Sequence, residues 1–100
     1  MHSALVRWVP AEAGGLETLP PVLRIIALSL FPEEGTNWRD GVWSIVLFFD
    51  QPPAEQTNRS STEARVDFAF PEAPHERLHA GARFGVYYGP TKVADVDVLD

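Results

Sequence analysis

The chain of 100 residues contains no cysteine. Disulfide bonds, thiolate nucleophiles and cysteine-ligated zinc sites are therefore excluded by composition. Basic residues are also scarce: eight lysines and arginines stand against fourteen aspartates and glutamates, for a formal net charge of −6. A surface that binds nucleic acid takes much of its affinity from an excess of cations, so this charge balance disfavours a nucleic-acid partner.

Long apolar runs are missing as well. The longest candidate, residues 22–31, contains Arg24 and lies between two prolines. It is much shorter than the roughly 18 apolar residues that a membrane-spanning helix needs. The first residues show no basic region leading into an apolar one, so no signal peptide is predicted. We therefore expect a cytoplasmic protein with no membrane partner.

Apolar residues make up 45% of the sequence, which is enough for the core of one domain over residues 1–100. In several segments they alternate with other residues, the pattern of a strand with one buried face. Gly89-Pro90 separates the last two of these segments and predicts a hairpin turn. The predicted strands with clear patterns are residues 4–8, 63–70, 84–88 and 93–98, together with residues 42–49, which are apolar on both faces.

One further apolar segment fits two patterns. Leu23, Ile26, Ala27 and Leu30 have helical spacing, whereas Ile26, Leu28 and Leu30 have strand spacing. Its β-branched residues and its short length between prolines favour a strand, although the helix stays open. Six strands with no credible long helix predict an all-β fold, either a closed barrel or a sandwich.

Short motifs follow one another in a recognisable order. They are Glu-Ala-Gly-Gly at residues 12–15, Leu-Pro at 19–20, Arg-Val-Asp-Phe-Ala-Phe-Pro at 65–71, and Gly-Ala-Arg-Phe at 81–84 followed by Val86, Gly89 and Val98. Their order and spacing resemble the C-terminal β-barrel domain, the third domain, of elongation factor Tu and related translational GTPases, here as a stand-alone domain. The resemblance covers nearly the whole chain and implies a six-stranded antiparallel closed barrel of Greek-key topology.

The chain departs from that family at its functional parts. No Gly-x-x-x-x-Gly-Lys-[Ser/Thr] phosphate loop is present, so no GTPase domain, nucleotide or other cofactor is predicted. In the family, basic residues around two loops help to hold transfer RNA. The equivalent loops contain Leu16 in place of arginine and a single cation, and residual binding to transfer RNA or the ribosome is retained only as an alternative. The residues of these RNA-binding-equivalent loops are Gly14, Gly15, Leu16, Gly89 and Lys92.

Residues 75–79 read His-Glu-Arg-Leu-His and match the His-Glu-x-x-His motif of zinc peptidases. That motif works when a sustained helix places both imidazoles on one face beside a metal-bound water. A proline before the motif and a glycine after it leave room for about one and a half turns, so we expect a loop or a single helical turn. A small zinc-dependent hydrolase that uses His75, Glu76 and His79 is the alternative. Otherwise no metal site and no catalytic residue are predicted.

Asp95 and Asp97 share one face of a predicted strand and could be taken for a pair of catalytic carboxylates. Such residues more often form the solvated face of a barrel, where they pair with basic residues on the next strand. We therefore predict a structural pairing with Arg83 across the last hairpin.

Aromatic residues exceed what a small barrel can hold inside, because only alternate side chains point inward. If Trp43 and the alternate residues after it point inward, Val46 and Phe48 point outward and form an exposed apolar surface, which often marks a partner site. A cover formed by residues 51–62 is an equal alternative. The sequence thus predicts a non-catalytic module that binds another protein or a second copy of itself, with candidate contacts at Trp43, Val46, Phe48, Tyr87 and Tyr88.

Overall fold

A computed structural model describes residues 1–31 and 42–100. Within these ranges the regular structure consists of strands and short 3₁₀ turns, and no helix there is long and apolar enough to cross a membrane. The strands are β1 (His2–Trp8), β2 (Arg24–Leu30), β3 (Val42–Phe48), β4 (Ser61–Phe68), β5 (Arg83–Tyr88) and β6 (Thr91–Val98), and the turns are η1 (Ala11–Ala13), η3 (Pro53–Glu55) and η4 (His75–Arg77).

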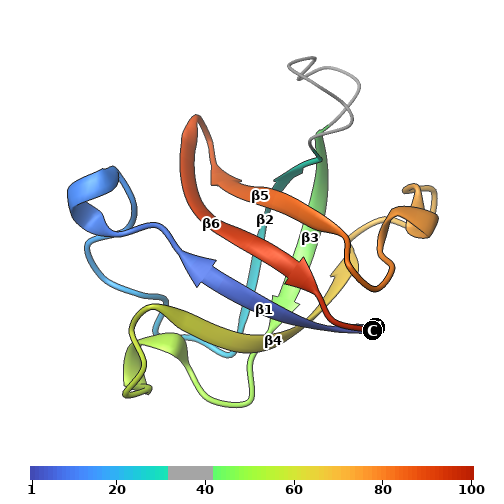
Figure 1. Ribbon diagram of the computed structural model, residues 1–100. Helices are drawn as coiled ribbons and strands as arrows, with labels where there is room; N and C mark the ends of the chain where they lie inside the picture. Colours follow the sequence, from blue (N-terminus) through green and yellow to red (C-terminus); the bar gives the residue numbers. More distant parts are fainter. Residues whose placement is uncertain (32–41) are drawn as a thin grey trace.

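The strands form one closed antiparallel barrel in the order β1-β4-β3-β2-β5-β6, as Figure 1 shows. Pairing between β6 and β1 closes the sheet. Consecutive strands β2, β3 and β4 are neighbours, and β5 then returns to pair with β2. The predicted all-β, six-stranded closed barrel is therefore confirmed.

The segment that fitted both a helix and a strand forms β2. It pairs along its full length with β3, from Arg24 opposite Phe48 to Leu30 opposite Val42, and its second half also pairs with β5. Pairing with β3 along the whole strand, and with β5 along its second half, provides hydrogen-bond partners for its backbone groups. The preference for a strand was correct.

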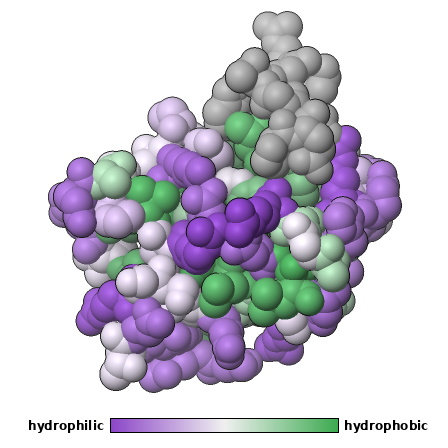
Figure 2. Space-filling view, in the orientation of Figure 1, coloured by the Kyte–Doolittle hydropathy of each residue, from purple (hydrophilic) through white to green (hydrophobic). Residues whose placement is uncertain are grey.

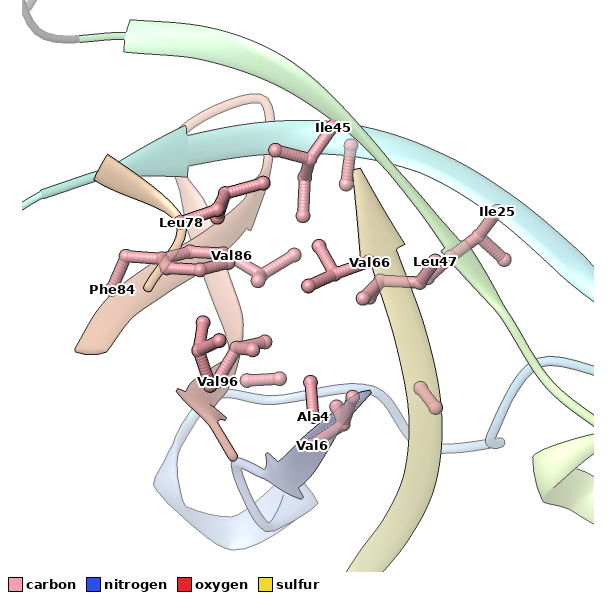
Figure 3. Packing of buried hydrophobic residues seen from close by; sticks show 14 of the residues in the cluster. Ala4, Val6, Ile25, Ile45, Leu47, Val66, Leu78, Phe84, Val86 and Val96 are labelled. Atoms are coloured by element: carbon pink, nitrogen blue, oxygen red, sulfur yellow. The ribbon is translucent and has the colours of Figure 1, made fainter. Parts of the chain in front are cut away.

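The barrel interior is filled by alternate side chains from all six strands (Figure 3). Aromatic packing strengthens it at one end, where the ring centroids of Phe31 and Phe84 lie 4.7 Å apart. The polar groups inside are bonded: the Trp8 indole N–H donates to Thr62 Oγ1 at 2.9 Å, and the Ser29 hydroxyl donates to the Trp43 carbonyl at 2.7 Å. Residues at the centre of the core include Ala4, Val6, Ile45, Leu47, Val66, Val86, Val96 and Val98.

The β5–β6 hairpin contains an irregularity that sets the direction of its side chains. The register shifts next to Val86, so that Val86 lies opposite Ala94 whereas Tyr87 lies opposite Lys92. Val93 is the extra residue, and both Val93 and Ala94 are buried. A bulge of this kind re-aims the side chains beyond it, and here it leaves Tyr87 and Lys92 together on the outer surface.

Candidate functional site

Three of the five predicted contact residues lie on the outside of the barrel. Val46 and Phe48 alternate with buried residues of β3, and Tyr87 pairs with an outward position of β2. Trp43 and Tyr88 instead pack against the hydrophobic core and are half-buried. Burial raises the pKa of the Tyr88 hydroxyl above the ordinary value for tyrosine. These two side chains therefore contribute to the packing of the barrel, and only part of each is open to a partner.

Strand β2 joins the outward residues of β3 to those of β5. Ile26 lies directly opposite Val46, and Leu28 lies opposite both Ser44 and Tyr87. Because opposed residues of antiparallel strands project from the same side of the sheet, these side chains form one continuous surface. We call it the apolar face; its members are Ile26, Leu28, Leu30, Val42, Val46, Phe48 and Tyr87.

The apolar face is open to solvent at its centre. Ile26 is 61% exposed, although it belongs to a strand with neighbours on both sides. On β2 and β3 the outward positions that are not apolar are Arg24 and Ser44. Outward strand positions are usually polar where a sheet meets water, so this stretch of the surface has the composition of a contact region.

The loop after β3 does not enclose the face. It turns to the end of the barrel, where the Ala54 N–H donates to the Pro20 carbonyl at 3.0 Å and Pro53 is buried.

Phe48 lines an open hollow of about 390 Å³ together with Leu99, beside β1 and β4. Figure 2 shows a hydrophobic area over β1 and β4, below a hydrophilic band over β6.

A second hollow, of about 410 Å³, borders the apolar face at β5. Its floor is Gly85, and a Cβ added there would lie 3.0 Å from the Tyr87 ring and 3.3 Å from Lys92 Cε. Glycine therefore lets these two side chains lie close to the strand. We call this the Gly85 hollow; its lining is Arg7, Leu30, Arg83, Phe84, Gly85, Tyr87, Lys92 and Asp95.

Charged side chains around the Gly85 hollow are joined into pairs. Asp97 accepts a hydrogen bond from Arg7 Nε at 2.9 Å and forms an ion pair with Arg83, whose Nε lies 2.6 Å from Oδ1, so that one carboxylate on β6 bridges both flanking strands. Lys92 Nζ lies 2.8 Å from Asp95 Oδ1. The predicted pairing of Arg83 with an aspartate across the hairpin is confirmed for Asp97.

In the loops equivalent to the RNA-binding loops of the resembled family, the glycines allow backbone conformations or close contacts that other residues would not. Gly14 has φ 96°, a left-handed conformation that disfavours side chains, and a Cβ at Gly15 would overlap the Val9 carbonyl. Leu16 lines a hollow with Glu12 and Glu17. Gly89, with φ 58°, forms the β5–β6 turn beside Lys92, whose charge is paired with Asp95. Acidic groups near both loops make them poor phosphate sites.

The His-Glu-x-x-His segment, predicted as a loop or a single helical turn, forms the turn η4, which ends at Arg77. His75 Nε2 lies 3.1 Å from the carbonyl oxygens of Phe70 and Pro71, and its ring meets Phe68 edge-on. His79 Nδ1 instead contacts the Ala80 carbonyl at 3.0 Å. Across residues 1–31 and 42–100, no group of three or more metal-ligating side chains converges on one point.

Sequence reasoning missed two sets of residues at these surfaces. The strand pattern of Ile26, Leu28 and Leu30 was predicted, but not that these residues form the outward face of the strand. The ion pair that Arg7 forms with the same aspartate as Arg83 was not predicted. Comparison with protein-family models and with curated proteins finds no match for the chain. The functional argument therefore rests on the geometry of the apolar face and the adjoining hollow.

Proposed function

We propose that the chain is a non-catalytic binding module that docks on another protein through the apolar face. The observation that supports this most directly is the exposure of Ile26, which is 61% at the centre of the apolar face. Removing apolar surface from water is worth roughly 25 cal/mol per Å². A partner that covers this face therefore gains free energy from side chains that the fold itself leaves in contact with solvent.

The closed barrel limits how a partner can bind. Each described strand has a neighbour on both sides, so no strand is an edge along its whole length to which a partner strand could be added. Docking must use side chains across the sheet face instead. Ile26 and Val46, opposed at the middle of this face, are the anchor positions in our proposal.

The same proposal includes a relationship to the third domain of elongation factor Tu, without the GTPase function. The closed six-stranded antiparallel barrel is the fold that this resemblance implies, which supports the proposal. The acidic groups beside the Gly14-Gly15 and Gly89 loops favour a protein partner over RNA. A cytoplasmic location, which suits a chain without cysteine, also belongs to the proposal.

The test compares three forms of the protein as bait in a lysate: wild type, Ile26→Asp, and Phe70→Asp. Phe70 is 48% exposed but lies outside the apolar face, so it controls for the loss of an exposed apolar residue. We expect wild type and Phe70→Asp to retain the same protein and Ile26→Asp to lose it. Light scattering of each form shows whether that partner is a second copy. Equal retention by all three forms, or a wild-type monomer that retains nothing, would contradict the proposal.

A further inference from the structure

Two arginines beside the apolar face are held in place by one carboxylate. Arg7 on β1 donates through Nε to Asp97 on β6 at 2.9 Å, and Arg83 on β5 forms an ion pair with the same carboxylate, with Nε 2.6 Å from Oδ1. The Asp97 side chain is 19% exposed, whereas those of Arg7 and Arg83 are 45% and 71% exposed. The carboxylate is thus set into the surface, and the two guanidinium groups above it face solvent.

This arrangement leaves hydrogen-bond donors for a ligand. A guanidinium group has five N–H donors in a planar fork. Arg83 contacts Asp97 through Nε, and Arg7 adds a long contact from one terminal nitrogen at 3.4 Å. The remaining terminal N–H groups make no other hydrogen bond to the described residues. Such forks match the two oxygens of a carboxylate, and fixing Nε lowers the entropy cost of binding.

The charge around the Gly85 hollow selects a singly charged anion. Three cations, Arg7, Arg83 and Lys92, stand against two carboxylates, Asp95 and Asp97, which leaves +1 in a chain whose net charge is −6. A carboxylate of charge −1 balances this excess. A phosphate dianion would leave a negative charge next to two aspartates, which is unfavourable.

The hollow is also continuous with the apolar face. Leu30 and Tyr87 belong to both, and Gly85 between them keeps the floor low. From these contacts we infer that the Gly85 hollow binds the carboxylate of an aspartate or glutamate in the partner's docking segment, while apolar side chains of the same segment lie on the apolar face. The inference rests on the proposed function and specifies the chemistry of its partner: an acidic, apolar peptide segment.

Titrations followed by NMR test the hollow directly. Sodium acetate is added to the full chain at constant ionic strength, with inorganic phosphate as the second anion. We expect saturable shifts of the Gly85 amide and of the Arg7 and Arg83 Nε–H signals with acetate, and weaker ones with phosphate. Arg83→Gln should weaken acetate binding by at least about fivefold. Arg59→Gln, which removes an exposed arginine elsewhere, should leave it unchanged.

A matched pair of capped peptides, Leu-Leu-Glu-Leu and Leu-Leu-Gln-Leu, separates this inference from the proposed function. We expect the glutamate peptide to bind more tightly and to shift both the Gly85 and the Ile26 amides. Equal binding of both peptides at Ile26 would overturn the acidic specificity and leave the apolar docking face standing. Acetate shifts at Gly85 with no peptide shift at Ile26 would overturn the docking face alone. The inference is overturned if acetate causes no shift or if phosphate binds more tightly than acetate. It is also overturned if Arg59→Gln loses as much acetate affinity as Arg83→Gln.

Discussion

Ile26 and Val46 lie directly opposite each other on β2 and β3, with both side chains on the outside of the barrel. The residue before Ile26 on the same strand, Ile25, is 8% exposed and belongs to the core. Successive residues of a strand point to opposite faces. Two chemically identical side chains, adjacent in sequence, therefore have different physical roles, one in packing and one at the surface.

The two isoleucines provide a matched test of this difference. Ile25→Ala removes buried methyl and methylene groups and leaves a cavity, so we expect a loss of about 2–4 kcal/mol in the free energy of unfolding. Ile26→Ala should cost less than about 1 kcal/mol, because its side chain is already largely hydrated. Urea denaturation of both variants measures the two values. Equal losses would mean that Ile26 packs against something on the folded chain and that no free face exists.

The bond between Trp8 and Thr62 predicts a coupling inside the core. Thr62 is 1% exposed, and its hydroxyl is the acceptor for the Trp8 indole at 2.9 Å. Thr62→Val keeps the shape but leaves a buried N–H without a partner, at a cost of about 1–3 kcal/mol. In a Trp8→Phe background the same substitution should be close to neutral, since no N–H remains to be satisfied. Urea denaturation of the four proteins gives the coupling, and an equal cost in both backgrounds would contradict it.

Much of the fold could be predicted because its signal is local. Alternation of apolar residues along residues 63–70 and 93–98 predicted β4 and β6, and Gly89-Pro90 predicted the hairpin turn. The end of β4 was predicted too late, because the strand stops at Phe68 and Phe70 is exposed. Prolines limited the strands, since a proline cannot donate a hydrogen bond within a sheet. The single helical turn at residues 75–77 also followed from local restrictions, because neither a proline nor a glycine extends a helix.

The direction of β2 could not be predicted in the same way. Arg24, Ile26, Leu28 and Leu30 point outward, while the core receives Ile25, Ala27 and Ser29. Two of the inward side chains, Ala27 and Ser29, are small, and the large core side chain of this segment, Phe31, follows the end of the strand. Both faces of the strand carry large apolar residues, so hydropathy alone does not decide the orientation. Only the pairing with β3 and β5, which is set by distant parts of the chain, decides it.

The charged cluster depends on long-range register even more strongly. Arg7 and Asp97 are 90 positions apart in the sequence, and no local pattern connects them. Their contact follows from the pairing of β1 with β6, which closes the barrel and places Leu5 opposite Asp97 and Arg7 opposite Asp95. The pairing of Arg83 with an aspartate could be predicted because both belong to one hairpin, in which the register is limited by the turn.

Burial of Tyr88 predicts a stability that falls in alkaline solution. Its pKa is raised above the ordinary value of about 10 because desolvation disfavours the phenolate. Between the unfolded and the folded pKa, the folded state keeps a proton that the unfolded state has lost. The contribution is therefore complete below about pH 10 and is lost as the pH rises through the folded pKa. Urea denaturation of wild type and Tyr88→Phe from about pH 8 to about pH 11 should show the wild-type advantage shrinking, and a constant difference would contradict it.

Asp97 should matter for stability in a way that another surface aspartate does not. It bridges β1, β6 and β5 through two arginines and is 19% exposed, whereas Asp50 lies 3.5 Å from Arg65 and is 97% exposed. Asp97→Asn leaves two guanidinium groups close together without their shared anion, so we expect a loss of about 1 kcal/mol that becomes smaller in high salt. Asp50→Asn, the matched control, should have no measurable effect, because exposed ion pairs contribute little. Urea denaturation at low and high salt separates the two, and similar small effects would show that Asp97 does not hold the arginines in place.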